Sequence, residues 1–316
     1  MSVLPRVLDV VADRTVVPGY TKLGFLLRKR FWAPLPPDAL RGKRVLITGA
    51  NSGLGKAAAT AMARLGGTVH LVVRDAERGE RAKSGIQAEV PGAAIRVDLC
   101  DVSDLDDVRR FAATVTDVDV LVHNAGTLPP ERTETAQGNE VTLATHVLGP
   151  HLLTELLTPA LREGEPGRVI FVSSGGMYSQ PLRIDDPQYL DGEYNGTKAY
   201  ARTKRMQVVL ALLWGRRLEC DGITVHSTHP GWAATPGVTD SLPGFAKLMG
   251  PLLRDAEQGA DTVVWLAAAE EGGRPETTGQ FWHDRAPRPA HYLRRTRETA
   301  AQREALWQFC EERTGR

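Results

Sequence analysis

The feature that most constrains the fold of this chain is a regular alternation of short apolar runs with longer segments of helical periodicity. Runs rich in Val, Ile and Leu favour β-strands, and apolar residues three and four positions apart favour helices. Their alternation indicates βαβ units, and near-continuous apolar strands indicate a parallel sheet covered by helices on both faces. We expect strands at Arg44–Thr48, Thr68–Val73, Ala94–Asp98, Asp119–His123, Arg168–Ser173, Thr224–His229 and Gly279–His283, and helices at Leu54–Leu65, Ser103–Val115, Glu140–Leu161, Lys198–Leu218 and Glu257–Ala269.

A single domain accounts for this pattern better than two domains do. The chain has 316 residues, which is enough for two small domains or one large one. No linker or change in composition interrupts the alternation, so we predict an α/β fold with one doubly wound, Rossmann-like parallel sheet at residues 44–287. An N-terminal amphipathic arm at residues 1–43 precedes this domain, and a C-terminal helical tail at residues 288–316 follows it.

The arm at residues 1–43 combines apolar helical stripes with a local charge of +5, from eight Lys and Arg against three Asp. Such an arm can lie on an anionic membrane surface, or it can pack its stripe on the protein's own body or on a second subunit. Packing is favoured because amphipathicity mostly reports burial. Charged residues interrupt the N-terminus, so no signal peptide is expected, and the longest uncharged stretch, Met206–Gly215, is too short to span a membrane.

Charge and cysteine content argue against several classes of function. The chain has 39 Lys and Arg against 38 Asp and Glu, a net charge of +1. A field this weak does not gather nucleic-acid phosphates, so no nucleic-acid partner is expected. The three cysteines, Cys100, Cys220 and Cys310, are far apart and form no Cys-x-x-Cys motif, so neither a disulfide framework nor a metal site is expected. We expect a cytoplasmic protein, peripheral to a membrane if the arm binds lipid.

A glycine-rich loop joins the first expected strand to the first expected helix. In this context the first glycine permits a sharp turn, the second lets the backbone approach a pyrophosphate, and the third lets the helix pack closely on the strand. The start of the helix adds free N–H groups and the positive end of the helix dipole. We therefore expect a dinucleotide to bind at Gly49, Asn51, Ser52, Gly53, Leu54 and Gly55.

The end of the second expected strand should select the dinucleotide, since this position follows the loop by about twenty residues. Arg74 and Asp75 stand there. A cation at this place binds the 2′-phosphate of NADP(H), whereas a carboxylate binds the ribose hydroxyl of NAD(H). Arg74 comes first and Asp75 can cap the following helix. NADP(H) is therefore favoured, and NAD(H) is the alternative.

Five motifs, taken in order, resemble those of the short-chain dehydrogenase/reductase family. They are the glycine loop at Thr48–Gly55, Asn124-Ala125-Gly126, a strand that ends in Ser173-Ser174, a Tyr-x-x-x-Lys spacing, and Pro230-Gly231. The segments Val172–Met177, His229–Val238 and Glu257–Thr262 resemble the retinol-dehydrogenase-like members. The resemblance implies NAD(P)-dependent interconversion of an alcohol and a carbonyl on a small-molecule substrate by a Ser-Tyr-Lys set, in an enzyme that is commonly a homo-oligomer.

Two Tyr-x-x-x-Lys spacings occur, Tyr194/Lys198 and Tyr200/Lys204. The residues between Tyr194 and Lys198 have turn and N-cap chemistry, so Tyr194 should precede the helix. Tyr200 and Lys204 should lie within it, four residues apart on one face. We therefore select Tyr200/Lys204 as the catalytic pair, and the family's catalytic helix is similar to this stretch.

The chemistry of this pair can be argued from its residue types. A phenol with a pKa near 10 is a weak base at neutral pH, but an adjacent ammonium and a positive nicotinamide lower that pKa. In reduction Tyr200 would donate its proton to the carbonyl oxygen, and Ser174 would donate a hydrogen bond to that oxygen. The resemblance assigns this role to Ser174 rather than Ser173, and strand alternation places the two on opposite faces.

The resemblance also implies the remaining cofactor contacts. Lys204 should hold the hydroxyls of the nicotinamide ribose beside Tyr200. The other contacts are expected from Asp101 and Val102 at the adenine, from Asn124, Ala125 and Gly126 along the cofactor, and from Pro230, Gly231, Trp232 and Thr235 at the nicotinamide amide and the pyrophosphate.

One position departs from the family pattern. His146 stands where many members have an asparagine that helps hold a water in a proton relay to the lysine. An imidazole can donate and accept hydrogen bonds, so His146 could maintain the relay in altered form. Alternatively, His146 packs between helices and the backbone maintains the relay. Both interpretations are kept open.

We therefore predict an NADP(H)-dependent alcohol dehydrogenase or carbonyl reductase. The segment Trp232–Pro251 is apolar and contains glycines and prolines, as a loop covering a lipophilic substrate would. The alternative, motivated by His146, is a catalytically weak NADP(H)-binding regulatory or interaction protein with the same fold. A sugar-nucleotide epimerase would fit the Tyr/Lys pair but lacks an obvious larger C-terminal substrate region.

Overall fold

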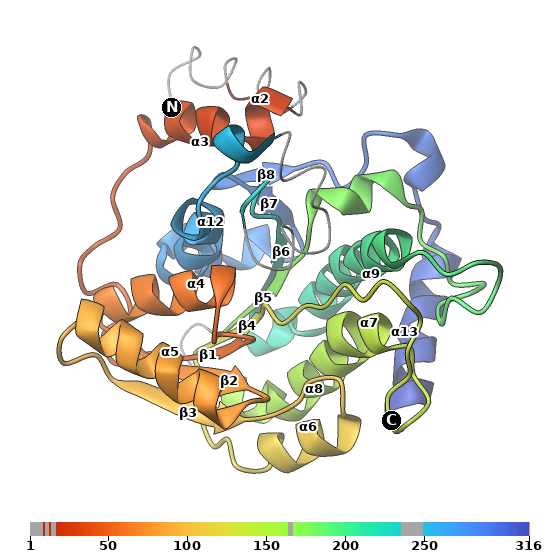
Figure 1. Ribbon diagram of the computed structural model, residues 1–316, viewed down its shortest axis with the longest axis horizontal. Coiled ribbons are helices and arrows are strands. Elements are labelled where there is room, and N and C mark those ends of the chain that lie inside the picture. The colour runs from red at the N-terminus through yellow and green to blue at the C-terminus, as the bar shows by residue number, and fades with distance from the viewer. Residues whose placement is uncertain (1–8, 10–12, 14–16, 164–166, 235–248, 316) are drawn as a thin grey trace.

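The computed structural model describes residues 9, 13, 17–163, 167–234 and 249–315, and an eight-stranded sheet runs through them (Figure 1). The strand order is β3-β2-β1-β4-β5-β6-β7-β8, with parallel pairing except between β7 and β8. The strands are β1 (Arg44–Thr48), β2 (Thr68–Val73), β3 (Ile95–Leu99), β4 (Val120–His123), β5 (Arg168–Val172), β6 (Thr224–Thr228), β7 (Phe281–His283) and β8 (Ala286–Arg288). The predicted doubly wound α/β fold is confirmed.

Helices cover both faces of this sheet (Figure 1). One layer consists of α4 (Gly53–Arg64), α5 (Ala76–Glu89) and α12 (Ala256–Ala268), and the other of α6 (Leu105–Ala112), α8 (Gly149–Arg162) and α9 (Gly196–Arg217), with α13 (Ala300–Thr314) packed against α9. Strand side chains alternate between the two layers. In β1, Val45 and Ile47 pack with the first layer and Leu46 packs with the second, which explains why the strands are apolar throughout.

The helix expected at residues 140–161 is divided into three parts. It consists of α7 (Val141–Leu143), a π-helical turn η1 (Ala144–Leu148) and α8. Pro150 supplies a physical reason, because a proline has no N–H to donate to the carbonyl four residues before it. The series of α-helical hydrogen bonds is therefore interrupted at the carbonyl of His146. The helix there forms π-helical hydrogen bonds, which span one residue more than α-helical ones.

Among the strands of the sheet and the helices that cover it, α5 and β8 were not predicted. The helix α5 is rich in charged residues and buries only Gly79, Ala82 and Ile86, so its apolar periodicity is weak. The strand β8 contains Pro287, a residue that argues against a strand except at a sheet edge. β8 lies at such an edge and pairs with β7 through a two-residue turn.

Part of the N-terminal arm packs on the protein's own body. Its described residues form α2 (Val17–Tyr20) and α3 (Lys22–Lys29), and α3 buries Phe25 and Arg28. The backbone carbonyl of Tyr20 accepts hydrogen bonds from Trp232 N (2.8 Å) and Arg254 Nε (3.0 Å). The arm thus docks on the body, as the favoured interpretation expected, but not through its apolar stripe, because Leu23, Leu26 and Phe31 of that stripe are exposed.

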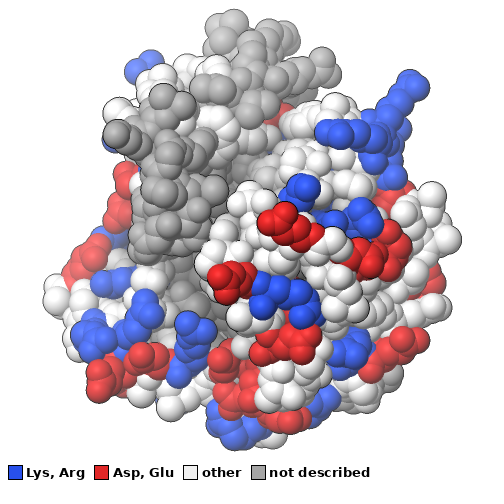
Figure 2. Space-filling model, turned by 45° about the vertical axis from the view of Figure 1, so that its right-hand side comes forward, with Lys and Arg blue, Asp and Glu red and all other residues white. Residues whose placement is uncertain are grey.

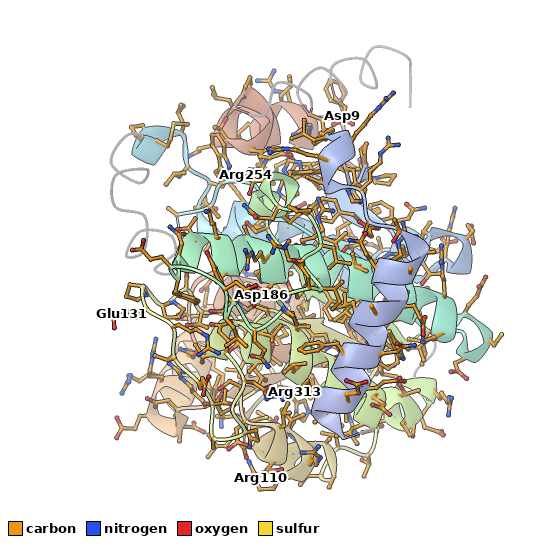
Figure 3. The ribbon with its side chains drawn as sticks, turned by 90° about the vertical axis from the view of Figure 1, so that its right-hand side faces the viewer. Asp9, Arg110, Glu131, Asp186, Arg254 and Arg313 are labelled. Carbon is orange, nitrogen blue, oxygen red and sulfur yellow. The ribbon has the colours of Figure 1, made fainter. Side chains whose placement is uncertain are left out.

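A buried cluster of ions holds the arm in place. Arg254 and Asp284 each expose 1% of their side chain and form a bidentate pair at 2.6 and 2.8 Å. Arg28 donates to the same carboxylate at 2.6 Å and to Asp9 at 2.7 Å. Asp9 also pairs with Arg288 at 2.7 Å. Asp9 and Arg254 come from distant parts of the sequence and lie at the same end of the molecule (Figure 3).

The described surface carries charges of both signs. Basic and acidic side chains are interspersed over the face shown in Figure 2, in keeping with the net charge of +1. Among the described helices, none combines the length and the apolarity that a membrane span requires.

Removing the charge of Asp284 should destabilise the fold. Asp284→Asn keeps the shape and tolerates the backbone φ of 52° at this position, but it leaves the buried guanidinium of Arg254 without a carboxylate and leaves Arg28 paired with Asp9 alone. We expect a loss of about 3–5 kcal/mol in the free energy of unfolding, measured by urea denaturation. Asp185→Asn, which breaks an exposed pair with Arg183, is the control and should cost less than about 1 kcal/mol. Equal losses in the two variants would contradict the structural role assigned to the cluster.

Candidate active site

A cleft of about 600 Å³ opens at the carboxyl ends of the parallel strands. The strand order reverses between β1 and β4, and loops that diverge at such a point leave a crevice for a ligand. The cleft is lined by these residues predicted from the sequence: Gly49, Asn51, Ser52, Gly53, Leu54, Gly55, Arg74, Asp101, Val102, Asn124, Ala125, Gly126, Ser174, Tyr200, Lys204, Pro230, Gly231 and Trp232. Thr235 lies outside the described residues, as does most of Trp232–Pro251, and His146 is fully buried behind the cleft.

The glycine loop after β1 and the segment after β4 pack backbone against backbone. Gly49 has a φ of 66°, and a Cβ added there would lie 2.8 Å from Ala125 Cα. A Cβ at Gly55 would lie 2.4 Å from the side-chain amide of Asn124. That amide donates to the carbonyls of Thr48 (2.9 Å) and Gly49 (3.2 Å). Glycine is therefore required at both positions for the two loops to meet beneath the cleft.

The start of α4 suits a phosphate group. Ser52 is its N-cap residue, but the Ser52 side chain makes no capping hydrogen bond. The N-termini of α5 and α6, in contrast, are capped by Asp75 and Asp104. Because Ser52, Gly53 and Leu54 line the cleft, the first N–H groups of α4 lie beside it without a capping side chain. These residues fit the pyrophosphate of a dinucleotide.

Two arginines stand at the adenosine end of this site. Arg74 and Arg78 are both exposed, both line the cleft, and neither pairs with a carboxylate among the described residues. Asp75 is engaged elsewhere, since its carboxylate accepts a hydrogen bond from Arg78 N at 2.9 Å and caps α5. Sequence reasoning missed Arg78. Arg78 could have been found from its position one helical turn after Arg74, but the helix α5 was not predicted.

Ser173 and Ser174 diverge at the end of β5 as alternation predicts. The Ser173 hydroxyl is buried and donates to the carbonyl of Lys204 at 2.8 Å. The Ser174 hydroxyl lies on the cleft side, where it accepts from Gly176 N at 3.2 Å. Ser173 thus holds the helix α9, and Ser174 is free to face a ligand.

Helix α9 carries Tyr200 and Lys204 on one face. It begins after Asn195, whose side chain accepts from Lys198 N at 2.9 Å, so Tyr194 lies before the helix. The Tyr194 hydroxyl donates to Glu140 at 3.0 Å. The Lys204 ammonium lies 5.4 Å from the centre of the Tyr200 ring and donates to the carbonyl of Val172 at 2.8 Å.

Burial shifts the pKa values of both groups. Burial raises the pKa of Tyr200, and the hydrogen bond from Ser174 lowers it only in part. Burial also lowers the pKa of Lys204 to about 7. Burial is thus the dominant effect on the pKa of Tyr200. The physical reason is desolvation, which disfavours the phenolate and also the ammonium that would stabilise it.

The ring of His146 is engaged away from Lys204. Its Nε2 accepts from Thr127 N at 3.0 Å, and its Nδ1 lies 2.8 Å from the hydroxyl of Thr203. That hydroxyl also donates to the Tyr200 carbonyl at 2.9 Å, so His146 Nδ1 is the donor in this pair. Burial lowers the pKa of His146, which keeps the ring neutral. Of the two interpretations left open, the geometry favours the packing histidine.

Comparison with known proteins connects this site to a family. The model of the short chain dehydrogenase family matches residues 43–185. The chain is 41% identical over 298 residues to dehydrogenase/reductase SDR family member 12 of Bos taurus, and covers 93% of each protein. It is 36% identical to retinol dehydrogenase 12 of Bos taurus over 78% of each chain. It is 38% identical to a Streptomyces protein named as a daunorubicin C-13 ketoreductase, over 80% of this chain and 87% of that one.

Solved structures give the same result. A Mycobacterium paratuberculosis protein of uncharacterised function is 30% identical, with a TM-score of 0.72 over 90% of this chain and 97% of its own. A short chain dehydrogenase/reductase family protein is 28% identical, with a TM-score of 0.62 over 77% of this chain and 96% of its own. The expected resemblance, including that to the retinol dehydrogenases, is confirmed. The chain belongs to the short-chain dehydrogenase/reductase family, and it is an NAD(P)-dependent oxidoreductase that acts on alcohol or carbonyl groups.

Proposed function

We propose that this oxidoreductase interconverts an alcohol and a carbonyl with NADP(H), using Ser174, Tyr200 and Lys204. One observation carries the proposal. The three side chains line the same cleft as the glycine loop, and Ser174 lies near enough to Tyr200 to favour its phenolate. A carbonyl oxygen placed between these two hydroxyls would meet both a proton donor and a hydrogen-bond donor.

The nicotinamide, when bound, supplies the hydride in reduction and accepts it in oxidation. Tyr200 donates its phenolic proton to the carbonyl oxygen as negative charge develops there. Ser174 stabilises the same oxygen with a hydrogen bond. Lys204, as an ammonium, stabilises the phenolate that Tyr200 becomes, and in oxidation the phenolate takes the proton back from the alcohol.

Two arginines support NADP(H) as the cofactor. Arg74 and Arg78 present two guanidiniums to the cleft, and a 2′-phosphate would neutralise them. A ribose hydroxyl of NAD(H) would need a carboxylate instead, but Asp75 already caps α5. We therefore retain NADP(H) and treat NAD(H) as the weaker cofactor.

Two observations support a lipophilic substrate. Trp232, Ala233, Val141 and Leu128 contribute apolar surface to the cleft. Relatives similar over most of the chain are named for retinol and daunorubicin, both of which have extended ring or polyene carbon skeletons. We propose that the substrate is a bulky apolar carbonyl compound or its alcohol.

We also propose that α3 brings the enzyme to an anionic membrane surface. Opposite its buried face, the arm exposes Leu23 (60%), Leu26 (43%) and Phe31 (47%). Lys22, Lys29 and Arg30 are exposed beside them, and among the described residues no carboxylate pairs with these three. Apolar side chains flanked by unpaired cations match the interface of a bilayer containing anionic lipid.

Tyr200→Phe should lower kcat by about 10²- to 10⁴-fold, because it removes the proton donor but keeps the ring. The assay measures NADPH oxidation with retinal-like, steroid, quinone and simple aldehyde substrates. Tyr194→Phe is the matched control and should keep activity within about twofold of the parent. If the parent enzyme binds NADPH tightly but turns over no member of the panel, the regulatory alternative replaces this proposal.

Arg74→Ala and Arg78→Ala should each weaken NADPH binding about 10- to 100-fold, the worth of a charge-assisted hydrogen bond. NADH affinity should stay within about twofold. Titration of nucleotide fluorescence measures both. Arg81→Ala is the control, since Arg81 lies on the same helix but pairs with Glu77. Equal losses for NADPH and NADH would defeat the assignment.

Replacing Leu23 and Leu26 by Glu should abolish flotation with vesicles of phosphatidylcholine and phosphatidylserine. The physical reason is the loss of apolar burial together with new repulsion by anionic lipid. Leu190→Glu and Leu293→Glu are matched controls, because these leucines are 68% and 46% exposed elsewhere on the surface. Flotation that persists in the α3 variant, or that is lost equally in the controls, would contradict membrane binding by α3 and leave it only the role of packing on the body.

A further inference from the structure

A buried glutamine connects the Lys204 ammonium to the backbone of the π-helical turn. Gln207 has no exposed surface. Its side-chain oxygen accepts from Lys204 Nζ at 3.0 Å, and its side-chain nitrogen donates to the carbonyl of His146 at 2.9 Å. Both ends of the amide are therefore satisfied, and its orientation is fixed by two different partners.

The sequence of the π-helical turn explains why the His146 carbonyl is available. In an α-helix this carbonyl would accept from the N–H of residue 150. Residue 150 is Pro150, which has no N–H. A buried carbonyl without a partner is costly, so the amide of Gln207 supplies the missing donor. The bridge thus joins α9 to the segment before α8.

We propose that Gln207 is a positioning residue that holds the Lys204 ammonium in its working orientation through the bridge to His146. This inference rests on the proposed role of Lys204. An ammonium has three donors in a tetrahedral arrangement. Two of them point at fixed acceptors, the carbonyl of Val172 and the oxygen of Gln207. The direction of the third N–H is thereby fixed, and the Lys204 side chain that carries it lines the cleft.

Gln207 also bears on the charge of Lys204. Two titratable groups interact with the ammonium: the phenol of Tyr200 on α9, whose ring centre lies 5.4 Å away, and the neutral imidazole of His146 on the π-helical turn, whose pKa the lysine charge lowers further. Burial lowers the pKa of Lys204 to about 7. Gln207 accepts a hydrogen bond from the charged form and so favours it. Without that acceptor the pKa of Lys204 should fall further.

Two variants of opposite effect test the proposal. Gln207→Met keeps the length of the side chain but removes both hydrogen bonds, so the pKa of Lys204 should fall. Gln207→Glu keeps an acceptor and adds a negative charge, so that pKa should rise. NMR titration of protein carrying ¹⁵N-labelled lysine, without nucleotide, measures the Lys204 pKa directly. The Lys204 signal is assigned by its loss in Lys204→Arg.

Turnover supplies the second measurement. The proposed step needs Lys204 charged, so carbonyl reduction should be lost as pH rises through its pKa. In Gln207→Met this basic limb should move to lower pH, and kcat at neutral pH should fall about tenfold, with KM within about threefold. In Gln207→Glu the limb should move to higher pH. Val209→Ala, a cavity variant on the same helix, should lower the melting temperature without moving the limb.

The two measurements separate the failure of this inference from the failure of the proposed function. If the parent enzyme reduces no carbonyl, the proposed function fails, and the NMR titration still decides the role of Gln207. An unchanged Lys204 pKa in both Gln207 variants would overturn the positioning role. So would pH limbs that coincide with those of the parent and of Val209→Ala, because a side chain that only fills space lowers stability without moving them.

Discussion

The reversal of strand order between β1 and β4 is the constraint on which the site depends. Parallel strands end at the same edge of the sheet, and the loops after β1 and β4 lead to opposite layers of helices. The crevice between them receives the glycine loop from one side and α9 from the other. Gly49 and Gly55 let the loop pack beneath it, and Asn124 ties the two strand ends together through Thr48. The topology of the sheet thus sets the position of the candidate active site, whichever side chains line it.

Burial sets the electrostatics of this crevice. Lys204 is 2% exposed, and its ammonium donates to two neutral acceptors, the carbonyl of Val172 and the side-chain oxygen of Gln207. Neutral acceptors compensate desolvation incompletely, so its pKa falls to about 7, close to neutrality. A group whose pKa lies near neutrality can gain or lose its proton at small free-energy cost. The ion cluster differs, since the carboxylate of Asp284 pairs with the buried guanidinium of Arg254.

Local sequence patterns predicted the sheet and its helices because their periodicity reports burial on one face or both. The pattern weakened where burial was slight, as in the polar helix α5, or where a proline stood in a strand, as in β8. The ion cluster escaped prediction for another reason. Arg28 and Arg254 are residue types expected on the surface, and they are buried only because Asp284, far along the chain, faces them.

The order of the motifs by itself determined the family, the glycine loop, and a phenol and an ammonium one helical turn apart at Tyr200 and Lys204. These features depend on neighbours in the chain, so spacing is sufficient to find them. Only the tertiary structure decided that Thr127 and Thr203 hold the ring of His146 while its carbonyl accepts from Gln207, 61 residues later. The physical reason is that a buried polar group takes the partner that packing brings to it, and residue spacing does not specify packing between distant segments.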